Sequence, residues 1–527
     1  MKKIKVYALL VCLLATSAAQ AQSFGSAAMR KLQMAEFAIS NFYVDKVDED
    51  KLVEEAIIKM LAQLDPHSTY SDAEEVKKMN EPLQGNFEGI GVQFQMIEDT
   101  LLVVQPVSNG PSEKVGILAG DRIIAVNDSA IAGVKMSTED IMSRLRGPKD
   151  SEVKLTIVRR GVDDQLYFTV KRDKIPILSL DASYMIQPKT GYIRINRFGA
   201  TTAEEFAEAL KSLQKKGMKD LILDLQGNGG GYLNAAIDLA NEFLGQKELI
   251  VYTEGRTAQR SEFFAKGNGE FRDGRLIVLV DEYTASASEI VSGAVQDWDR
   301  GIIVGRRSFG KGLVQRPIDL PDGSMIRLTI ARYYTPAGRC IQKPYDSSTD
   351  YNKDLIDRFN HGELMNADSI HFPDSLKVQT KKLKRTVYGG GGIMPDYFVP
   401  IDTTLYTDYH RKLVGKGVII KFTMKFIEDH RKELADKYKK FDSFNEKFVI
   451  DDDMLATLRE MGEKEGVKFN EEQYQKALPL IKTQLKALIA RDLWDMNEYF
   501  RVMNTTNESV QKALEILRSG EYQKKLK

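Results

Sequence analysis

The sequence predicts an α/β fold with a largely buried sheet. Residues 191–195 form a predicted strand, and two short apolar runs, 221–225 and 275–280, are typical of buried strands. Helical patterns follow them in turn: 202–215, a stretch ending near Leu244, and 286–297. Alternation of strands with helices indicates an α/β layer. A strand-rich region with Gly and Asp turns precedes this alternation, and a Lys/Glu-rich helical region follows it.

Length and composition limit the number of domains and the class of protein. A chain of 527 residues is long enough for about three to four domains. Hydrophobic residues at 43% and charged residues at 28% are ordinary for soluble globular protein. Lys plus Arg and Asp plus Glu both number 75, so no net field attracts nucleic acid or an anionic membrane. Two cysteines exclude a disulfide framework and a Cys-rich zinc module.

The N-terminus has the pattern of a secretory signal peptide. Lys2, Lys3 and Lys5 precede an apolar run at 6–15, and Ala19-Gln20-Ala21 fits a cleavage site. An N-terminal membrane anchor is the alternative, but the run is too short to span a bilayer. We expect residues 1–21 to be removed after export. The mature protein is then expected in the periplasm, with no transmembrane anchor. Cys340 is then the one remaining cysteine, and we interpret it as a packed thiol.

Changes in pattern along the chain predict the domain boundaries. The predicted segments are 22–85 (helical), 86–173 (a small strand-rich domain), 174–400 (the α/β core) and 401–527 (helical). A polar, weakly periodic stretch at 346–384 is expected to be an insertion in the core. The C-terminal helical region could pack on the core, dimerise or bind an adaptor, because an amphipathic pattern does not separate these roles.

A serine cluster follows the predicted strand at 275–280. Ser286 would lie at a helix N-terminus, where backbone N–H groups favour a developing oxyanion. Ser286 and Glu289 also form an S-x-x-E capping box, and this motif alone favours that structural role. Ser288 is a rival nucleophile, but its place inside the helix directs its hydroxyl away from the helix end.

A serine nucleophile needs a base. None of the histidines lies in the α/β segments beside the serine cluster; they are His67, His361, His371, His410 and His430. A lysine serves if burial keeps its amine neutral, and Lys311, between two glycines, is the candidate. A lone loop lysine is ordinarily a surface residue.

Two glycine-rich segments invite nucleotide-binding hypotheses. The segment 305–311 matches a P-loop until Gly312, where Ser or Thr should hold Mg²⁺, and the following residues look extended, with Pro317 ending them. The loop at 227–231 has Tyr232 at the third position of a dinucleotide fingerprint. We reject nucleotide binding. The loop at 227–231 is better suited to close backbone approach, with N–H groups available to an oxyanion.

Taken together, several motifs resemble, in order and spacing, the C-terminal processing (tail-specific) serine peptidases. They are Asp224-Leu225-Gln226-Gly227-Asn228-Gly229-Gly230-Gly231, Ser286-Ala287-Ser288-Glu289, Phe309-Gly310-Lys311-Gly312-Leu313-Val314-Gln315, Leu64-Asp65-Pro66-His67-Ser68, Tyr334-Thr335-Pro336-Ala337-Gly338-Arg339 and Gly392-Ile393-Met394-Pro395-Asp396. The likeness covers about residues 30 to 400. It implies a crotonase/Clp-like α/β core with an inserted PDZ domain.

The resemblance also implies roles for individual residues. Ser286 would be the nucleophile, Lys311 the general base and Gln315 the residue that orients the lysine. The N–H of Ala287 and one from Gly229, Gly230 or Gly231 would form the oxyanion hole. Many relatives have Arg where this chain has Gln226, so a contact made by that arginine is not expected here. Neither a cofactor nor a metal is implied.

The small domain resembles a PDZ module through its segment 111–127. Backbone N–H groups at Gly89, Ile90 and Gly91 would capture a chain-terminal carboxylate, and the strand beginning at Val92 would pair with the peptide. The expected partners are proteins or peptides with free C-termini. The sequence therefore predicts an exported serine endopeptidase that acts through an acyl-enzyme. The alternative is a catalytically silent PDZ scaffold.

Overall fold

The computed structural model describes residues 26–97, 99–345, 351 and 353–527. The predicted signal peptide lies outside the described residues. By their contacts, the described residues form two compact units, one of residues 26–73 with 316–329 and one of 74–315 with 330–527. Of the helices described, none combines the length and the apolar character that crossing a bilayer requires.

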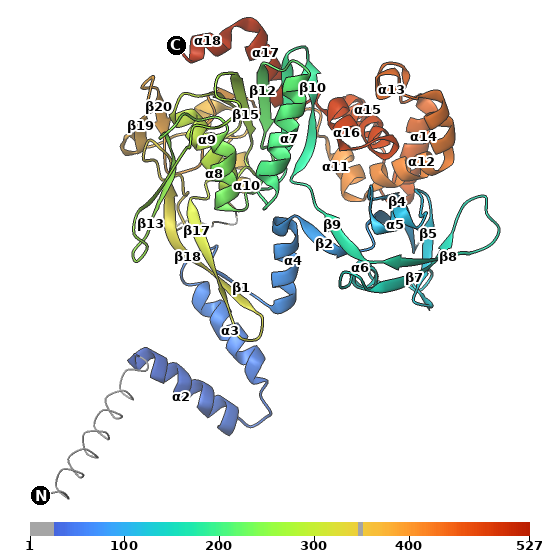
Figure 1. Ribbon diagram of the computed structural model, residues 1–527, viewed down its shortest axis with the longest axis horizontal. Helices are drawn as coiled ribbons and strands as arrows, with labels where there is room; N and C mark the ends of the chain where they lie inside the picture. Colours follow the sequence, from blue (N-terminus) through green and yellow to red (C-terminus); the bar gives the residue numbers. More distant parts are fainter. Residues whose placement is uncertain (1–25, 98, 346–350, 352) are drawn as a thin grey trace, which may run out of the picture. The chain divides into compact units, whose positions relative to one another are not determined.

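The predicted fold class is confirmed by a six-stranded sheet in the second unit (Figure 1). Its order is β10 (Leu180–Gln187), β11 (Thr190–Ile195), β12 (Asp220–Asp224), β15 (Arg275–Val280), β16 (Ile302–Gly305) and β21 (Tyr397–Phe398). β10 and β11 are antiparallel, and every later neighbour pair is parallel. Helices α7 (Thr202–Lys215), α8 (Leu233–Asn241) and α9 (Ala287–Asp297) cover one face.

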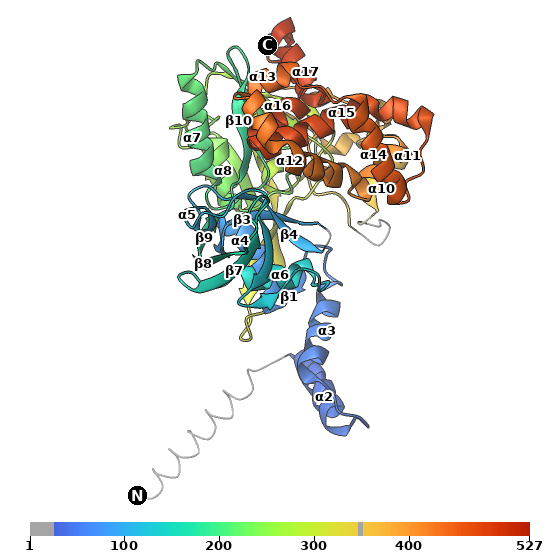
Figure 2. The ribbon, with the colours of Figure 1, turned by 90° about the vertical axis from the view of Figure 1, so that its right-hand side faces the viewer.

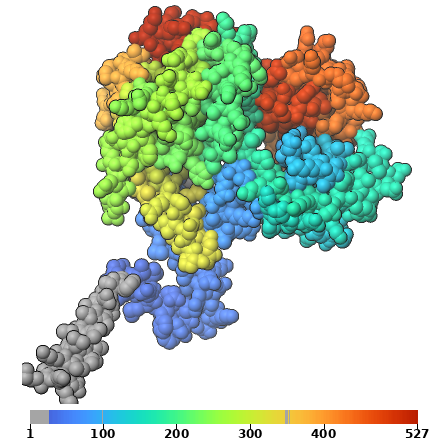
Figure 3. All heavy atoms as spheres, viewed as in Figure 1, coloured from blue at the N-terminus to red at the C-terminus, as the bar shows by residue number. Residues whose placement is uncertain are grey.

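Alternate side chains along each central strand pack on opposite faces, as a pleated strand requires. In β12, Leu221 and Leu223 join the core beneath α7 to α9, whereas Ile222 faces the other side. That other side is covered by α17 (Glu508–Ser519) and α18 (Glu521–Lys525) at the C-terminus. In Figure 3 the red C-terminal atoms lie directly on the green atoms of this core. The end of the predicted helical region is therefore part of the α/β core.

The strand-rich domain has the order β3 (Val92–Ile97), β4 (Thr100–Pro106), β5 (Arg122–Val126), β7 (Glu152–Val158) and β8 (Leu166–Lys171), with β6 (Ser129–Ala130) beside β5. Helices α5 (Pro111–Lys114) and α6 (Thr138–Leu145) close its core. The chain enters and leaves through paired strands β2 (Asn86–Gly89) and β9 (Asp173–Pro176). The domain is thus inserted as one module between α4 (Ala73–Gln84) and the central sheet.

The remaining elements complete the chain. The first unit contains α2 (Ala27–Phe42), α3 (Glu49–Leu61) and β1 (Thr69–Ser71), which pairs with the start of β18 (Met325–Tyr334). A second sheet also includes β13 (Leu249–Glu254), β14 (Ser261–Phe264) and β17 (Leu313–Asp319). The helical region comprises α11 (Asp408–Gly415), α12 (Val418–Lys437), α13 (Phe441–Lys447), α14 (Asp452–Lys464), α15 (Glu471–Leu493) and α16 (Met496–Met503), packed on their own apolar core (Figure 2).

Two local expectations are corrected. Helix α8 ends at Asn241 and not near Leu244. Pro317 does not end the extended segment, because β17 continues through it to Asp319 with the residue exposed. The described residues of the predicted insertion contain α10 (Asp354–Asn360), two 3-10 turns (Ala367–Ser369 and Asp374–Leu376) and β19 (Lys377–Gln379), which pairs with β20 (Thr386–Tyr388) just beyond the insertion.

The packing of α17 on the sheet predicts that this helix stabilises the core. Ile516 is fully buried against it, so Ile516→Ala should lower the free energy of unfolding by about 2–5 kcal/mol. Glu515→Ala, on the exposed side of the same helix, is the control and should change it by less than about 0.5 kcal/mol. Urea unfolding measures both; equal effects would show that α17 does not pack there.

Candidate active site and peptide groove

The turn between β15 and α9 presents Ser286 in an uncommon conformation. Its φ of 57° and ψ of −115° are sparsely populated by residues other than glycine. The turn is fixed by Thr284, whose hydroxyl donates to the carbonyl of Leu225 at the end of β12. Ser286 is half-buried at the start of a buried helix. The turn therefore places Ser286 beside the loop that follows β12, where its Cβ lies close to Gly230.

Ser288, the rival nucleophile, is fully buried, and its hydroxyl donates a hydrogen bond of 3.0 Å to the carbonyl oxygen of Asn228. It lies inside α9, as its sequence position indicated. Of these two serines, Ser286 is the one that a substrate can reach.

Glu289 connects the Ser286 turn to the loop that carries Lys311. Its Oε2 accepts the N–H of Ser286 at 2.8 Å and the N–H of Lys311 at 2.9 Å. Its Oε1 accepts the N–H of Gly310 at 2.7 Å and the hydroxyl of Ser308 at 2.5 Å. The carboxyl is completely buried, and this burial raises its pKa against the lowering effect of the four hydrogen bonds. One side chain thus holds two catalytic candidates that are distant in sequence.

Tyr333 on β18 makes a second connection between the same two segments. Its hydroxyl lies 3.0 Å from the carbonyl oxygen of Ser286 and 2.5 Å from that of Lys311, and it has one proton to donate between them. Burial raises the pKa of Tyr333 well above 10, so the hydroxyl stays protonated. The sequence analysis missed Tyr333, although it directly precedes the motif beginning at Tyr334.

Lys311 and Gln315 are both half-buried, Lys311 in the loop and Gln315 in β17. The loop is anchored upstream by the N–H of Phe309, which donates to the carbonyl of Thr284 at 2.9 Å. After Lys311 the chain forms strand β17, whereas a P-loop would continue as a helix. The nucleotide-binding hypothesis is therefore unsupported by the local structure.

The glycine loop after β12 approaches the serine turn closely. The carbonyl of Asn228 accepts the N–H of Ala285 at 3.0 Å. At Gly230 a Cβ atom would lie 2.8 Å from Cβ of Ser286 and 2.9 Å from the nitrogen of Ala287. Its φ of 100° also favours glycine. The contact beside Ser286 therefore requires the absence of a side chain at Gly230.

The N–H groups of this loop differ in their availability. The N–H of Gly230 donates to Oδ1 of Asn228 at 2.8 Å. Over the described ranges, by contrast, the N–H groups of Gly229, Gly231 and Ala287 donate no hydrogen bond. Of the predicted oxyanion donors, Gly230 is thus already engaged.

Arg194 lies beside Gln226, at the start of the loop that follows β12. Its guanidinium donates to Asp224 at 2.7 Å and to the carbonyl of Gln226 at 2.8 Å. Gln226 itself hydrogen bonds back to Asp224 through its N–H and its side chain. Burial alone would lower the pKa of Arg194, but Asp224 and its neighbours raise it overall. Arg194 was not found by sequence analysis, because it lies on a separate strand, β11.

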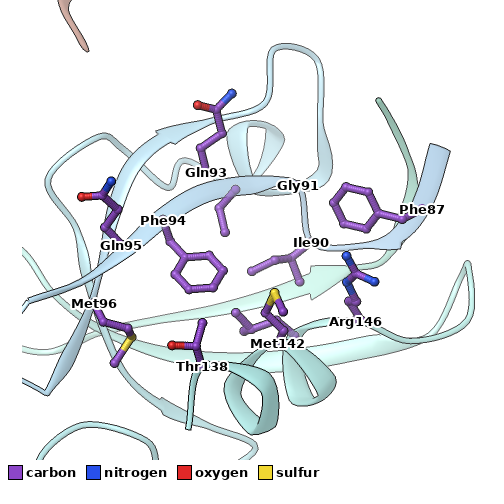
Figure 4. A pocket seen from close by; sticks show the side chains of 12 residues that line it. Phe87, Ile90, Gly91, Gln93, Phe94, Gln95, Met96, Thr138, Met142 and Arg146 are labelled. Carbon is purple, nitrogen blue, oxygen red and sulfur yellow. The ribbon is translucent and has the colours of Figure 1, made fainter. Parts of the chain in front are cut away.

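A groove of about 550 Å³ lies between β3 and α6 of the strand-rich domain (Figure 4). Three of the residues predicted to bind a peptide, Ile90, Gly91 and Val92, line it. Gly89 does not line it, because it ends β2 and pairs there with Asp173. The other lining residues are Phe87, Gln93, Phe94, Gln95, Met96, Thr138, Met142, Leu145 and Arg146. The groove is therefore mainly apolar, with an arginine at one end.

Arg146 pairs with Glu81 at 2.6 Å, and its guanidinium lies 4.7 Å from the ring centre of Phe87. It was not predicted, because nothing in its local pattern distinguishes it from a solvated arginine.

His410, His430 and Cys340 lie in surroundings that favour structural roles. Among the described residues, no cluster of His, Cys, Asp and Glu is arranged to hold a metal ion. His410 and His430 are hydrogen bonded within the helical region. Cys340 is a free, half-buried cysteine whose pKa burial raises, so thiolate chemistry is disfavoured there.

Comparisons with known proteins identify the families that this chain resembles. Residues 189–349 match the model of peptidase family S41, and residues 89–174 match the PDZ domain. Residues 13–75 match the "Activating protease CtpB N-terminal domain", and 409–495 match a family of unknown function, DUF8443. The S41 match ends before α10.

Similar full-length proteins extend the match. The chain is 38% identical over 328 residues to carboxy-terminal processing protease CtpB of Bacillus subtilis, covering 62% of this chain and 68% of that protein. It is 40% identical over 305 residues to a carboxy-terminal-processing protease of Bartonella bacilliformis, covering 57% and 69%. A solved photosystem II D1 C-terminal processing protease is 27% identical and covers 71% of this chain and 93% of that one, with a TM-score of 0.35.

The four hydrogen bonds to Glu289 predict that its amide analogue loosens the Lys311 loop. Glu289→Gln places an NH₂ donor against N–H donors and should lower the free energy of unfolding by about 1–3 kcal/mol. Hydrogen exchange at Gly310 and Lys311 should speed up. Glu262→Gln, in an exposed ion pair with Arg260, is the control and should change neither quantity. Unchanged exchange in Glu289→Gln would contradict the connection.

Proposed function

Because the chain belongs to the carboxy-terminal processing serine peptidases with a PDZ domain, we propose that it is an exported endopeptidase with a Ser286–Lys311 dyad. The observation that carries the dyad is the shared carboxylate of Glu289, which hydrogen bonds the backbone N–H of both residues. Export, to the periplasm, rests on the signal-peptide pattern of residues 1–21.

In the proposed reaction, Oγ of Ser286 attacks the carbonyl carbon of the scissile peptide bond while the neutral amine of Lys311 accepts its proton. The tetrahedral intermediate collapses when the C–N bond breaks and the leaving amine takes the proton from Lys311. The product is an acyl-enzyme on Ser286. A water molecule, deprotonated by Lys311, then hydrolyses the ester. Gln315 on β17 would orient the lysine side chain.

We assign the oxyanion hole to the N–H of Ala287 together with that of Gly229 or Gly231. The N–H of Ser286 is unsuitable because it donates to Glu289, and that of Gly230 because it donates to Asn228. Gly230 contributes through its close approach to Ser286. In this arrangement the α9 N-terminus adds its partial positive charge where the oxyanion develops.

The PDZ groove would hold the substrate's C-terminal tail. An extended tail can add to the edge of β3, and its terminal carboxylate would meet backbone N–H groups at Ile90 and Gly91. Phe94, Met96 and Met142 provide an apolar surface for the last side chains (Figure 4). The substrate class is therefore proteins or peptides with a free, apolar C-terminus.

Removal of either dyad member should abolish peptidase activity. Ser286→Ala and Lys311→Ala should each lower kcat/KM on an unfolded substrate by at least about 10³-fold. Ser212→Ala and Lys216→Ala, both on the surface at the end of α7, are matched controls and should cleave normally. Wild-type activity in either dyad variant would refute the dyad. Without acylation of the wild type by a fluorophosphonate, the chain would be a silent PDZ scaffold.

The groove predicts recognition of a free carboxylate. A fluorescent peptide ending in Leu should bind the full-length Ser286→Ala variant, and amidation of its C-terminus should weaken binding by at least about tenfold, because a charged acceptor is lost. A terminal Asp should also weaken binding, since the groove lining is mainly apolar. Fluorescence anisotropy measures each affinity. Equal affinities for the free and amidated peptides would exclude this mode of binding.

A further inference from the structure

Helix α10 (Asp354–Asn360), in the insertion, places one arginine against the loop that carries Lys311. Arg358 is 3% exposed. Its Nη2 donates to the carbonyl of Arg307 at 2.7 Å, and its Nη1 donates to the carbonyl of Ser308 at 3.3 Å. Two successive carbonyls of the loop therefore point at a single guanidinium, whose planar fork suits paired acceptors.

The hydrogen-bond donors of the same loop are satisfied by Glu289. That carboxylate accepts the Ser308 hydroxyl and the N–H groups of Gly310 and Lys311. The segment 307–311 is thus fixed on its acceptor side by Arg358 and on its donor side by Glu289. The two side chains come from different elements, α10 and α9.

A second contact ties the start of α10 to the loop. The ammonium group of Lys343 lies 2.8 Å from a carboxylate oxygen of Asp354 and 3.8 Å from the ring centre of Phe309. The ring of Tyr351 lies 4.1 Å from the same ammonium group. The backbone N–H of Lys343 donates to the carbonyl of Gly310 at 2.9 Å. Two residues that directly precede Lys311 are therefore held by this cluster.

The cluster is costly as a purely stabilising device. Arg358 and Arg307 share one carboxylate, that of Glu363, inside a region of low exposure. Burial first, and then the charge of Arg307, lowers the pKa of Arg358 to about 10. Buried ion pairs seldom exceed well-packed apolar residues in net stability, so a gain in stability alone does not account for this cluster.

We propose that Arg358 is a positioning residue for the peptidase reaction: it fixes the backbone before Lys311 and thereby places the general base against Ser286. The inference rests on the proposed Ser286–Lys311 dyad and deepens it. Arg358 does not touch the substrate in this account. It acts through the carbonyls of Arg307 and Ser308, and the insertion becomes a part of the catalytic apparatus.

The consequence is kinetic. Proton transfer requires the amine of Lys311 within hydrogen-bond distance of the Ser286 hydroxyl. A misplacement of about 1 Å in a reacting group can cost about 10²-fold in rate. Loss of Arg358 should therefore slow acylation while leaving substrate binding in the PDZ groove intact.

The experiment measures acylation of the full-length protein by a fluorophosphonate, separating the maximal rate constant of inactivation from the half-saturating concentration. Arg358→Ala should lower the rate constant by about 10- to 100-fold and leave the half-saturating concentration within about twofold. Arg358→Lys keeps the positive charge but lacks the planar guanidinium group, so its rate constant should lie between those of Arg358→Ala and the wild type. Asp357→Asn, exposed on the same helix, is the control.

Rescue separates positioning from simple instability. Millimolar guanidinium should restore part of the acylation rate of Arg358→Ala, and ammonium should not, while peptide binding to the PDZ groove stays unchanged throughout. The proposal is overturned if folded Arg358→Ala and Arg358→Lys acylate at the wild-type rate. It is also overturned if every loss of rate follows loss of folded protein without rescue.

These results also separate the two proposals. If the wild type is not acylated at Ser286, the dyad fails and the role of Arg358 fails with it. If the wild type is acylated and the Arg358 variants match it, only the positioning role fails.

Discussion

The candidate site depends on one buried carboxylate that accepts four hydrogen bonds. Glu289 lies in the first turn of α9, fully buried, and its two oxygens take donors from the Ser286 turn and from the Lys311 loop. Burying a carboxylate destabilises the folded state unless its oxygens are fully hydrogen bonded, so each donor must be in position when the chain folds there. The same hydrogen bonds make the folded turn and loop mutually dependent, and they bring the backbone N–H groups of Ser286 and Lys311 to one carboxylate oxygen. In the proposed dyad, stability and chemistry would therefore share one constraint.

The surrounding architecture supports that constraint from several directions. The buried parallel strand β15 ends at the Ser286 turn, and the loop after β12 packs against it through Gly230. Tyr333 joins the Ser286 and Lys311 carbonyls, and the insertion supplies Arg358 to the far side of the Lys311 loop. On the other face of the sheet, α17 and α18 complete the core. The peptidase-like core is thus built from segments between residues 180 and 525 that are widely separated in sequence.

Sequence reasoning located the regular elements well where the apolar pattern is strong. Helix 202–215 and strand 275–280 have the predicted bounds, because each has a complete amphipathic or buried pattern. The capping box predicted only the hydrogen bond from the Ser286 N–H to Glu289. The hydrogen bonds that Glu289 accepts from the Lys311 loop were not predicted, because that loop lies more than twenty residues away. Tyr333, Arg194, Arg146 and Arg358 were missed for the same reason. Each acts on distant backbone or side-chain groups, and no local period encodes which groups those are. The availability of single N–H groups in the glycine loop was likewise hidden, since it depends on where the Asn228 side chain turns.

The central claim is that the Glu289 carboxylate aligns Ser286 with Lys311. The most direct test is the maximal rate of fluorophosphonate acylation at Ser286, mapped by mass spectrometry, in the wild type and in folded Glu289→Gln protein. The account predicts labelling of the wild type at Ser286 and a rate lower by about 10²-fold in the variant, with the half-saturating concentration of the probe unchanged. Wild-type acylation by folded Glu289→Gln protein, or labelling of the wild type at another serine, would contradict it.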